Sequence, residues 1–220
     1  EETEQVEGQA KLDRVLRALS SNFEYFQGLN YISAAFLARY PEDFSYWCVR
    51  YLMRRVNYFP TQLHLFRGHI ETLDSIVERQ LPTVYNHLRY NDVDLEYFAT
   101  RWLLTLYSYD TEVDLMLRLW RLVCLTDVSM ILCFTLVMLR KIESKILECD
   151  EEGLNQLLKF ELKQIVDRLD RQFLLEESVK IYLENFLEQQ PILDSMYLEM
   201  DEDVVHYRTT AAPIASEPPF

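Results

Sequence analysis

The sequence predicts an all-α fold, and three properties of the 220-residue chain support this prediction. Apolar residues make up 49% of the chain and aromatic residues 13%, whereas only four glycines and seven prolines interrupt them. So few interruptions favour long helices over a sheet with many turns. Apolar residues also recur at helical spacing, and no segment shows a persuasive alternation of apolar and polar residues. We therefore expect a multi-helix domain followed by a charged helical extension.

The first helices are predicted on either side of a short polar turn. A stripe at spacing i, i+3, i+4 and i+7 runs from Leu12 to Leu19, and Ser20-Ser21-Asn22 end that helix. The segment 30–38 is almost wholly apolar. Because a helix that is hydrophobic on all sides belongs inside a bundle, we expect this segment at the centre.

The rest of the chain predicts a series of helices whose starts carry capping residues. Pro82 either opens a new helix or kinks the one before it. The run from Val128 to Leu139 is too short to span a bilayer and indicates a core helix. The expected helices and their capping residues are 42–56 after Pro41, 61–73, 74–81, 95–107 with Asp94 as cap, 112–125 with Asp110 or Thr111, 128–147 after Asp127, and 154–188 with an amphipathic seam at Leu158, Leu162, Ile165, Val166 and Leu169.

The formal charge of −14 is distributed unevenly along the chain. Residues 11–145 carry 16 basic and 15 acidic side chains, whereas the first ten residues add four Glu and the segment after 145 has 6 basic and 17 acidic residues. Nucleic acid and anionic bilayers need a cationic surface, so neither is expected as the main ligand. We predict an acidic segment 1–10, a helical domain 11–150, helices 151–200 that belong to the domain or are appended to it, and a disordered tail 201–220.

Cysteine usage and the first residues indicate a cytoplasmic protein. Cys48, Cys124, Cys133 and Cys149 contain no C-x-x-C pair, which favours buried thiols in a reducing compartment. The chain opens with Glu1-Glu2-Thr3-Glu4 rather than a basic, apolar leader, so no signal peptide is expected. Without a transmembrane segment, association with endomembranes is expected only through partners.

The segment Y-F-Q-G-L-N-Y-I, residues 25–32, is the most informative part of the chain because it joins two helical patterns. Gln27 is neutral and can both donate and accept hydrogen bonds, so it could orient a water molecule. Gly28 can adopt backbone angles closed to its neighbours and allows close approach. Such a role requires the Gln27 amide to point outward beside an open concave surface.

Motifs for other chemistries are absent from the sequence. It contains neither G-x-x-x-x-G-K-[ST] nor G-x-G-x-x-G, so no nucleotide-binding loop of its own is expected. It also contains no H-E-x-x-H and no G-x-S-x-G, and the spacing of His64 and His69 places them on different helix faces. We therefore expect no metal and no cofactor bound by this chain itself.

Two blocks of this sequence resemble the TBC domain of Rab GTPase-activating proteins. Residues 25–32 are similar to the family's Y-x-Q-G-(M/L)-N signature. Residues 98–107 and 117–120 are similar to its F-A-x-x-W-(F/L)-x-x-L-F … (V/L)-x-R-(I/L)-W-D region, and the patterns fit from about Lys11 to Leu147. Trp102 and Trp120 lie on apolar stripes and are predicted to be packing residues.

The resemblance implies a role for Gln27 in GTP hydrolysis by a Rab-family small GTPase. In this family a glutamine orients the attacking water and an arginine from I-x-x-D-x-x-R neutralises charge on the phosphoryl group. GTP and Mg would be carried by the partner GTPase. Gln27 is the predicted catalytic residue, and Tyr25, Gly28 and Asn30 are predicted to contact the partner or to shape the loop.

The sequence departs from the family pattern at the arginine. Only 24 residues precede Tyr25, and none of them forms I-x-x-D-x-x-R. Arg14 and Arg17 do not match that motif and are predicted to be surface arginines. Arg121 also replaces the usual aspartate at the end of the second block.

Three explanations follow from this departure. The chain is a fragment of a Rab GTPase-activating protein whose arginine lies upstream, a TBC-like effector that binds a Rab without accelerating hydrolysis, or a helical scaffold. We favour the Rab-regulatory domain and expect the activity of this chain alone to be limited by the missing arginine.

Overall fold

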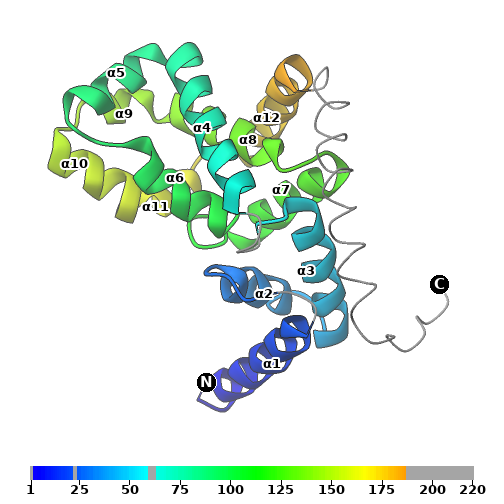
Figure 1. Ribbon diagram of the computed structural model, residues 1–220. Helices are drawn as coiled ribbons and strands as arrows, with labels where there is room; N and C mark the ends of the chain where they lie inside the picture. Colours follow the sequence, from blue (N-terminus) through cyan, green and yellow to red (C-terminus); the bar gives the residue numbers. More distant parts are fainter. Residues whose placement is uncertain (1, 22–23, 59–62, 187–220) are drawn as a thin grey trace. The chain divides into compact units, whose positions relative to one another are not determined.

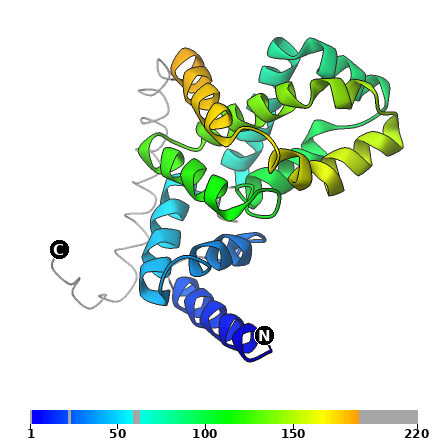
Figure 2. The same ribbon diagram turned by 180° about the vertical axis from the view of Figure 1, so that it is seen from behind.

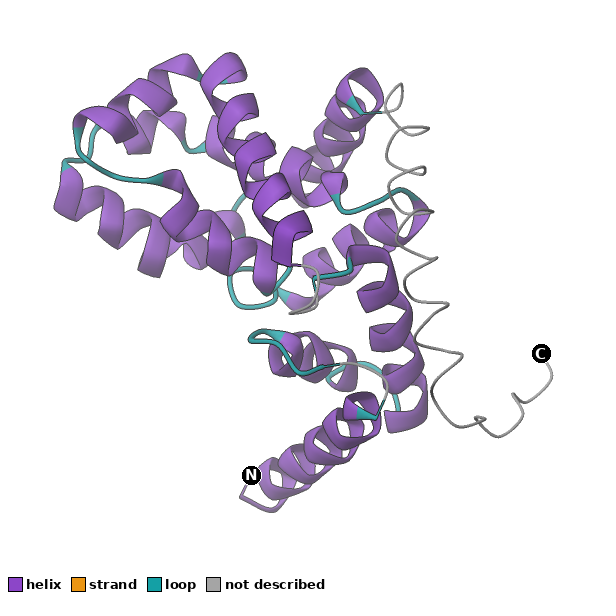
Figure 3. Ribbon diagram, in the orientation of Figure 1, coloured by secondary structure: helices purple, strands orange, loops and turns teal. Residues whose placement is uncertain are grey.

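A computed structural model describes residues 2–21, 24–58 and 63–186 of the chain. These residues form helices joined by turns and contain no strand, which confirms the all-α prediction (Figure 3). The helices are α1 (Glu2–Ser20), α2 (Leu29–Leu37), α3 (Glu42–Val56), α4 (Leu63–Gln80), α5 (Pro82–Tyr90), α6 (Leu95–Leu104), α7 (Val113–Leu125), α8 (Ser129–Lys141), α9 (Glu143–Leu147), α10 (Glu151–Gln156), the π-helix η2 (Leu157–Glu161), α11 (Leu162–Val166) and α12 (Arg171–Asn185) (Figure 1).

The chain divides into two compact units, Glu1–Lys180 and Ile181–Phe220. In the second unit, the rings of Tyr182 and Phe186 stack with their centroids 5.9 Å apart. The predicted tail 201–220 lies outside the described residues. The predicted boundaries after residues 10 and 150 stay predictions.

The centre of the first unit is α8, which is buried on all sides. Every side chain from Ser129 to Leu139 is buried, because this stretch is apolar apart from its two hydroxyl residues. The prediction of a core helix at 128–139 is therefore confirmed. Helices α4 and α7 pack against it, and α3 packs against α7 (Figures 1 and 2). None of the described helices has the length and apolar character needed to cross a membrane.

Helix α2 is not central, so the prediction for 30–38 was wrong. Tyr31 and Ala34 are exposed on the face opposite Ile32 and Phe36. Apolar composition alone did not distinguish this helix, since a tyrosine and an alanine can face water at little cost. Helix α2 instead packs against α1 and α3.

The other predicted helix limits were partly wrong. Residues 63–80 form one helix rather than two, residues 128–147 form two helices that separate at Ile142, and Pro82 opens α5. The predicted helix 154–188 is interrupted at residues 167–170, where Asp170 accepts hydrogen bonds from the backbone N–H groups of Gln172 and Phe173 and so starts α12. Asp94 caps α6 as predicted, with its carboxylate accepting from Glu96 N at 3.0 Å.

The four cysteines are free thiols, but only Cys133 is buried. Cys48, Cys124 and Cys149 are half-buried, so the prediction of buried thiols holds only for Cys133. Burial raises the pKa of the Cys124 thiol to about 11, which keeps it protonated near neutral pH.

His69 gives the fold a dependence on pH. Its Nδ1 lies 3.0 Å from Tyr58 Oη, and burial lowers its pKa from 6.5 to about 4, although the Asp127 carboxylate opposes this shift. The folded protein therefore holds a neutral imidazole in a pH range where the unfolded chain binds a proton. The contribution of the neutral His69 to the free energy of unfolding is fully present above pH 6.5, and it is lost as the pH falls from 6.5 to about 4.

We predict that His69→Gln removes this part of the pH dependence. Urea unfolding of the unchanged chain should show the free energy of unfolding falling by on the order of 3 kcal/mol between these two pH values. The variant should lose that slope, whereas His64→Gln, at an exposed histidine, should keep it. Equal slopes in the unchanged chain and in His69→Gln would contradict the assignment.

Candidate functional site

The Y-F-Q-G-L-N segment forms the turn that leads into α2. Gly28 is the N-cap of this helix, and its carbonyl accepts from Tyr31 N at 3.0 Å and from Ile32 N at 3.1 Å. Phe26 and Leu29 are buried on either side, whereas Gln27 is exposed. Within the described residues the Gln27 amide has no hydrogen-bonding partner. The two apolar neighbours anchor the turn and leave its amide facing outward.

Gly28 is required at its position for two independent reasons. Its φ is +117°, a backbone conformation that side-chain-bearing residues rarely adopt. A Cβ atom on residue 28 would also lie 2.6 Å from the carbonyl oxygen of Leu104. The turn therefore packs directly against the C-terminal end of α6, and this contact fixes where Gln27 stands.

The end of α6 closes in a Schellman motif. Tyr107 N donates to Trp102 O at 2.9 Å, and Leu106 N donates to Leu103 O at 3.1 Å, which are the two bonds of that motif. Leu106 and Tyr107 have φ values of +47° and +63°, where glycine or asparagine is usual. Both side chains are fully buried. The chain thus uses two bulky residues in a left-handed conformation beneath the Gln27 turn.

Two hydrogen bonds from the core hold this strained segment in place. Trp120 Nε1 donates to Leu106 O at 2.9 Å, and Tyr107 Oη donates to Thr135 Oγ1 at 2.8 Å. These bonds come from α7 and from the central helix α8. Such strain persists only where the surroundings determine the conformation strongly. Trp102 and Trp120 are buried, as predicted for packing residues.

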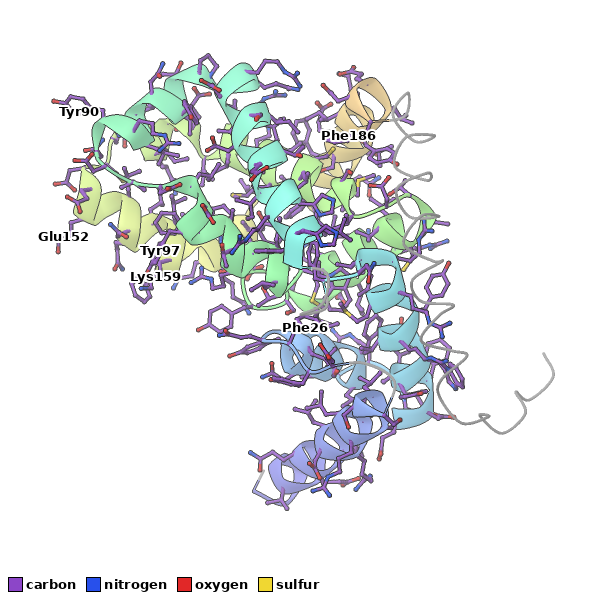
Figure 4. The ribbon with its side chains drawn as sticks, viewed as in Figure 1. Phe26, Tyr90, Tyr97, Glu152, Lys159 and Phe186 are labelled. Atoms are coloured by element: carbon purple, nitrogen blue, oxygen red, sulfur yellow. The ribbon has the colours of Figure 1, made fainter. Side chains whose placement is uncertain are left out.

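Gln27 lines an open pocket of about 270 Å³ together with side chains from α6 and from η2. Figure 4 labels Tyr97 and Lys159, the residues that bring α6 and η2 together at this pocket, and Phe26, which precedes Gln27. The amide of Gln27 therefore stands beside a concave surface that carries two cationic groups. The full lining is Gln27, Tyr97, Phe98, Thr100, Arg101, Leu104, Thr105 and Lys159.

Arg101 connects the pocket to the turn that follows α6. Its Nη2 donates to the buried carboxylate of Asp110 at 2.7 Å and to Leu158 O at 3.3 Å. Its guanidinium carbon lies 5.5 Å from the centre of the Tyr109 ring. Burial raises the pKa of Asp110, and the adjacent Arg101 guanidinium opposes that shift. Asp110 is thus a partner of Arg101 and not the helix cap that its position in the sequence predicted.

The structure places the four predicted site residues at one turn. Gln27 and Tyr25 are exposed, Gly28 is buried against α6, and Asn30 is half-buried in the first turn of α2. Their roles stay predictions. The sequence analysis did not anticipate the pocket residues Tyr97, Arg101, Thr105 and Lys159. Arg101 stands inside the second motif block and could have been found there, whereas nothing in the sequence singled out Lys159.

The two arginines that precede this turn in the sequence are engaged in ion pairs. Arg14 Nη2 lies 2.6 Å from Glu42 Oε1, and Arg17 Nε lies 2.8 Å from Asp13 Oδ2. Both side chains are exposed, with 56% and 78% of their surface accessible, as the sequence predicted. Neither of these arginines lines the pocket of Gln27.

Comparison with known proteins identifies the family to which this chain belongs. The model of the Rab-GTPase-TBC domain family matches residues 1–147, which include the Gln27 turn, α6 and α8. The chain belongs to this family. The η2 side of the pocket lies beyond the matched range.

Similar proteins include Rab GTPase-activating proteins of other organisms. The Caenorhabditis elegans Rab GTPase-activating protein eat-17 is 26% identical over 170 residues, which cover 74% of this chain and 19% of that protein. The chain thus spans about a fifth of the length of this relative. Two crystal structures share the fold of this TBC domain. The Chlamydomonas flagellar RabGAP TBC domain aligns with a TM-score of 0.68 at 23% identity, and the alignment covers 78% of this chain and 59% of that structure's chain. The Ypt/Rab-GAP domain of Gyp1p aligns with a TM-score of 0.64 at 22% identity, and the alignment covers 78% of this chain and 64% of that structure's chain.

We predict that Gly28→Ala destabilises the protein and Gly68→Ala does not. A methyl group at residue 28 meets Leu104 O and requires a left-handed alanine, so a loss of roughly 1–3 kcal/mol in the free energy of unfolding is expected. Gly68 lies in α4 with nothing within 4 Å of an added Cβ, so alanine there should stabilise by about 0.5–1 kcal/mol. Equal effects in urea titrations of the two variants would contradict the close contact.

Proposed function

We propose that this chain contributes the glutamine of a Rab GTPase-activating site. In this proposal Gln27 orients the water that attacks GTP, while the partner Rab holds the nucleotide and its Mg²⁺. The observation that carries the proposal is the exposed Gln27 amide beside an open pocket, on a turn fixed by Gly28. A neutral amide can accept from the water and donate toward the phosphoryl oxygens, which suits this task.

The position of the turn supports this chemistry physically. To orient a water molecule, a donor and acceptor must be held in place before the reaction. A flexible amide would pay a cost in conformational entropy that offsets the stabilisation of the transition state. The contact between Gly28 and Leu104 O and the two core hydrogen bonds beneath it provide such a support. The amide itself has no partner in the described chain that must be broken first.

The charge-neutralising arginine is not supplied by Arg14, Arg17 or Arg101 in this proposal. Arg14 and Arg17 form ion pairs away from the pocket, and Arg101 is committed to Asp110. An arginine finger contributes roughly 10³–10⁵ in rate in GTPases generally. We therefore expect this chain alone to bind a GTP-loaded Rab and to stimulate hydrolysis only weakly.

A second candidate function is Rab binding without stimulation. Arg121, which replaces the usual aspartate at the end of the second motif block, favours this alternative. In either case the protein would act at the cytoplasmic surface of endomembranes through its Rab partner. The two functions separate by measuring binding and hydrolysis on the same Rabs.

We predict that Gln27→Ala removes the stimulation while preserving binding. Purified Rabs loaded with GTP are assayed for single-turnover hydrolysis with saturating chain, and affinity is measured with a non-hydrolysable analogue. Removing one positioned group typically costs on the order of 10²-fold in rate, so stimulation should fall to background. The matched control is Gln164→Ala, at an exposed glutamine of α11 outside the pocket, and it should behave as the unchanged chain.

The possible outcomes distinguish the functions. Binding with no stimulation by the unchanged chain selects the binding function over the catalytic one. Stimulation that survives in Gln27→Ala contradicts the role of Gln27. Failure to bind any member of a Rab panel contradicts both functions and leaves a helical scaffold.

A further inference from the structure

Lys159 is a cationic group at the Gln27 pocket whose partners in the described structure include no carboxylate. Its Nζ donates to Tyr97 Oη at 3.0 Å and lies 5.5 Å from the ring centres of both Tyr97 and Phe160. Tyr97 and Phe160 are 59% and 63% exposed, so the ammonium stands at an open aromatic rim. A charge in this position has donors left for an anionic ligand, because an ammonium group carries three.

The backbone that presents Lys159 has an unusual local structure. Residues 151–166 form helix α10, the π-helix η2 and helix α11 in succession, and Lys159 is the middle residue of η2. A π segment widens the turn and occurs frequently at functional sites. Leu157 and Leu158 are buried inside this turn, whereas Lys159 is half-buried and Phe160 is exposed.

Arg101 ties the π segment to the pocket. Its Nη2 donates both to Leu158 O and to the Asp110 carboxylate, so the residue before Lys159 is bonded to the same guanidinium that lines the pocket. The position of Lys159 relative to Gln27 therefore does not depend on a flexible loop. Both side chains belong to one pocket wall made by α6, η2 and the turn before α2.

The charge of Lys159 contrasts with that of its surroundings. Residues 146–180, which belong to the same unit, carry nine acidic and five basic side chains, yet the residue of η2 that reaches the pocket is a lysine. An acidic partner surface would be repelled by most of this segment. Lys159 supplies a positive charge at the rim, next to the ion pair of Arg101 and Asp110.

We propose that Lys159, supported by Tyr97, pairs with an acidic side chain of the GTP-loaded Rab beside Gln27. This inference rests on the proposed function, since the same GTPase occupies the pocket. A carboxylate is the expected anion because the Tyr97 hydroxyl holds the ammonium back at the rim, where a surface side chain of a partner can reach it. A phosphate deep in the partner's nucleotide site would require a group that projects further. The two aromatic rings attract the ammonium group and help to hold it at the rim.

The test compares Lys159→Met with Lys163→Met by affinity for Rabs loaded with a non-hydrolysable GTP analogue. Lys163 is exposed one helical turn further on and does not line the pocket, so both variants make the same change in net charge. We expect Lys159→Met to weaken binding about tenfold and to reduce its dependence on ionic strength, as for the loss of a partly buried interfacial ion pair. Lys163→Met should change affinity less than about twofold.

Two further variants identify the chemistry of the contact. Lys159→Arg should retain most of the affinity, and all of these variants should melt as the unchanged chain does. Lys159→Glu should abolish binding, and one Asp→Lys or Glu→Lys change on the Rab should restore it. Absence of any restoring change overturns the carboxylate assignment.

Failure of this inference is distinguishable from failure of the proposed function. If the unchanged chain binds a Rab and Lys159→Met binds equally well, the ion pair is wrong and the role of Gln27 stands. If the unchanged chain binds no Rab, the proposed function fails and the ion pair fails with it.

Discussion

The site depends on one backbone contact, the approach of Gly28 to the carbonyl oxygen of Leu104. A Cβ at residue 28 would lie 2.6 Å from that oxygen, a separation that real Cβ atoms do not adopt, so only glycine lets the turn pack on the end of α6. The contact places Gln27 at the pocket wall formed by α6 and η2. If the turn moved away, the amide would remain exposed but would no longer stand beside Arg101 and Lys159.

The surface beneath this contact is built from strained residues that hydrogen bonds from the core hold in place. Leu106 and Tyr107 keep left-handed conformations without glycine, and their hydrogen bonds to Trp120 and Thr135 connect the end of α6 to α7 and to the buried helix α8. The packing of the central helix is therefore transmitted to the position of one exposed amide. Through this arrangement the two motif blocks, far apart in sequence, lie against each other in the fold. The first supplies the turn and the second supplies the platform for it.

Sequence reasoning predicted the helices well and their spatial roles less well. The helical spacing and the cap at Asp94 identified most elements, since these signals are local. Burial of α2 was misjudged because its exposed face carries Tyr31 and Ala34, which can face water at little cost. The turn at Gln27 was found from its residue types and its resemblance to a family signature. Asp110 was taken for a cap because its pairing with Arg101 is a tertiary contact. The Lys159 side of the pocket could not be predicted, since it arises from a π segment that brings residues about 60 positions apart in sequence within 3.0 Å.

The proposed function depends on the Gln27 amide, and a crystal structure of the chain with a Rab holding GDP and aluminium fluoride tests the role of this amide most directly. This nucleotide state mimics the transferring phosphoryl group, so any residue that orients the attacking water must lie next to it. If Gln27 orients the attacking water, its amide contacts the water and the fluoride group while Gly28 stays against Leu104 O. A complex in which the Gln27 turn faces away from the nucleotide, with the Rab bound to another surface, would contradict it.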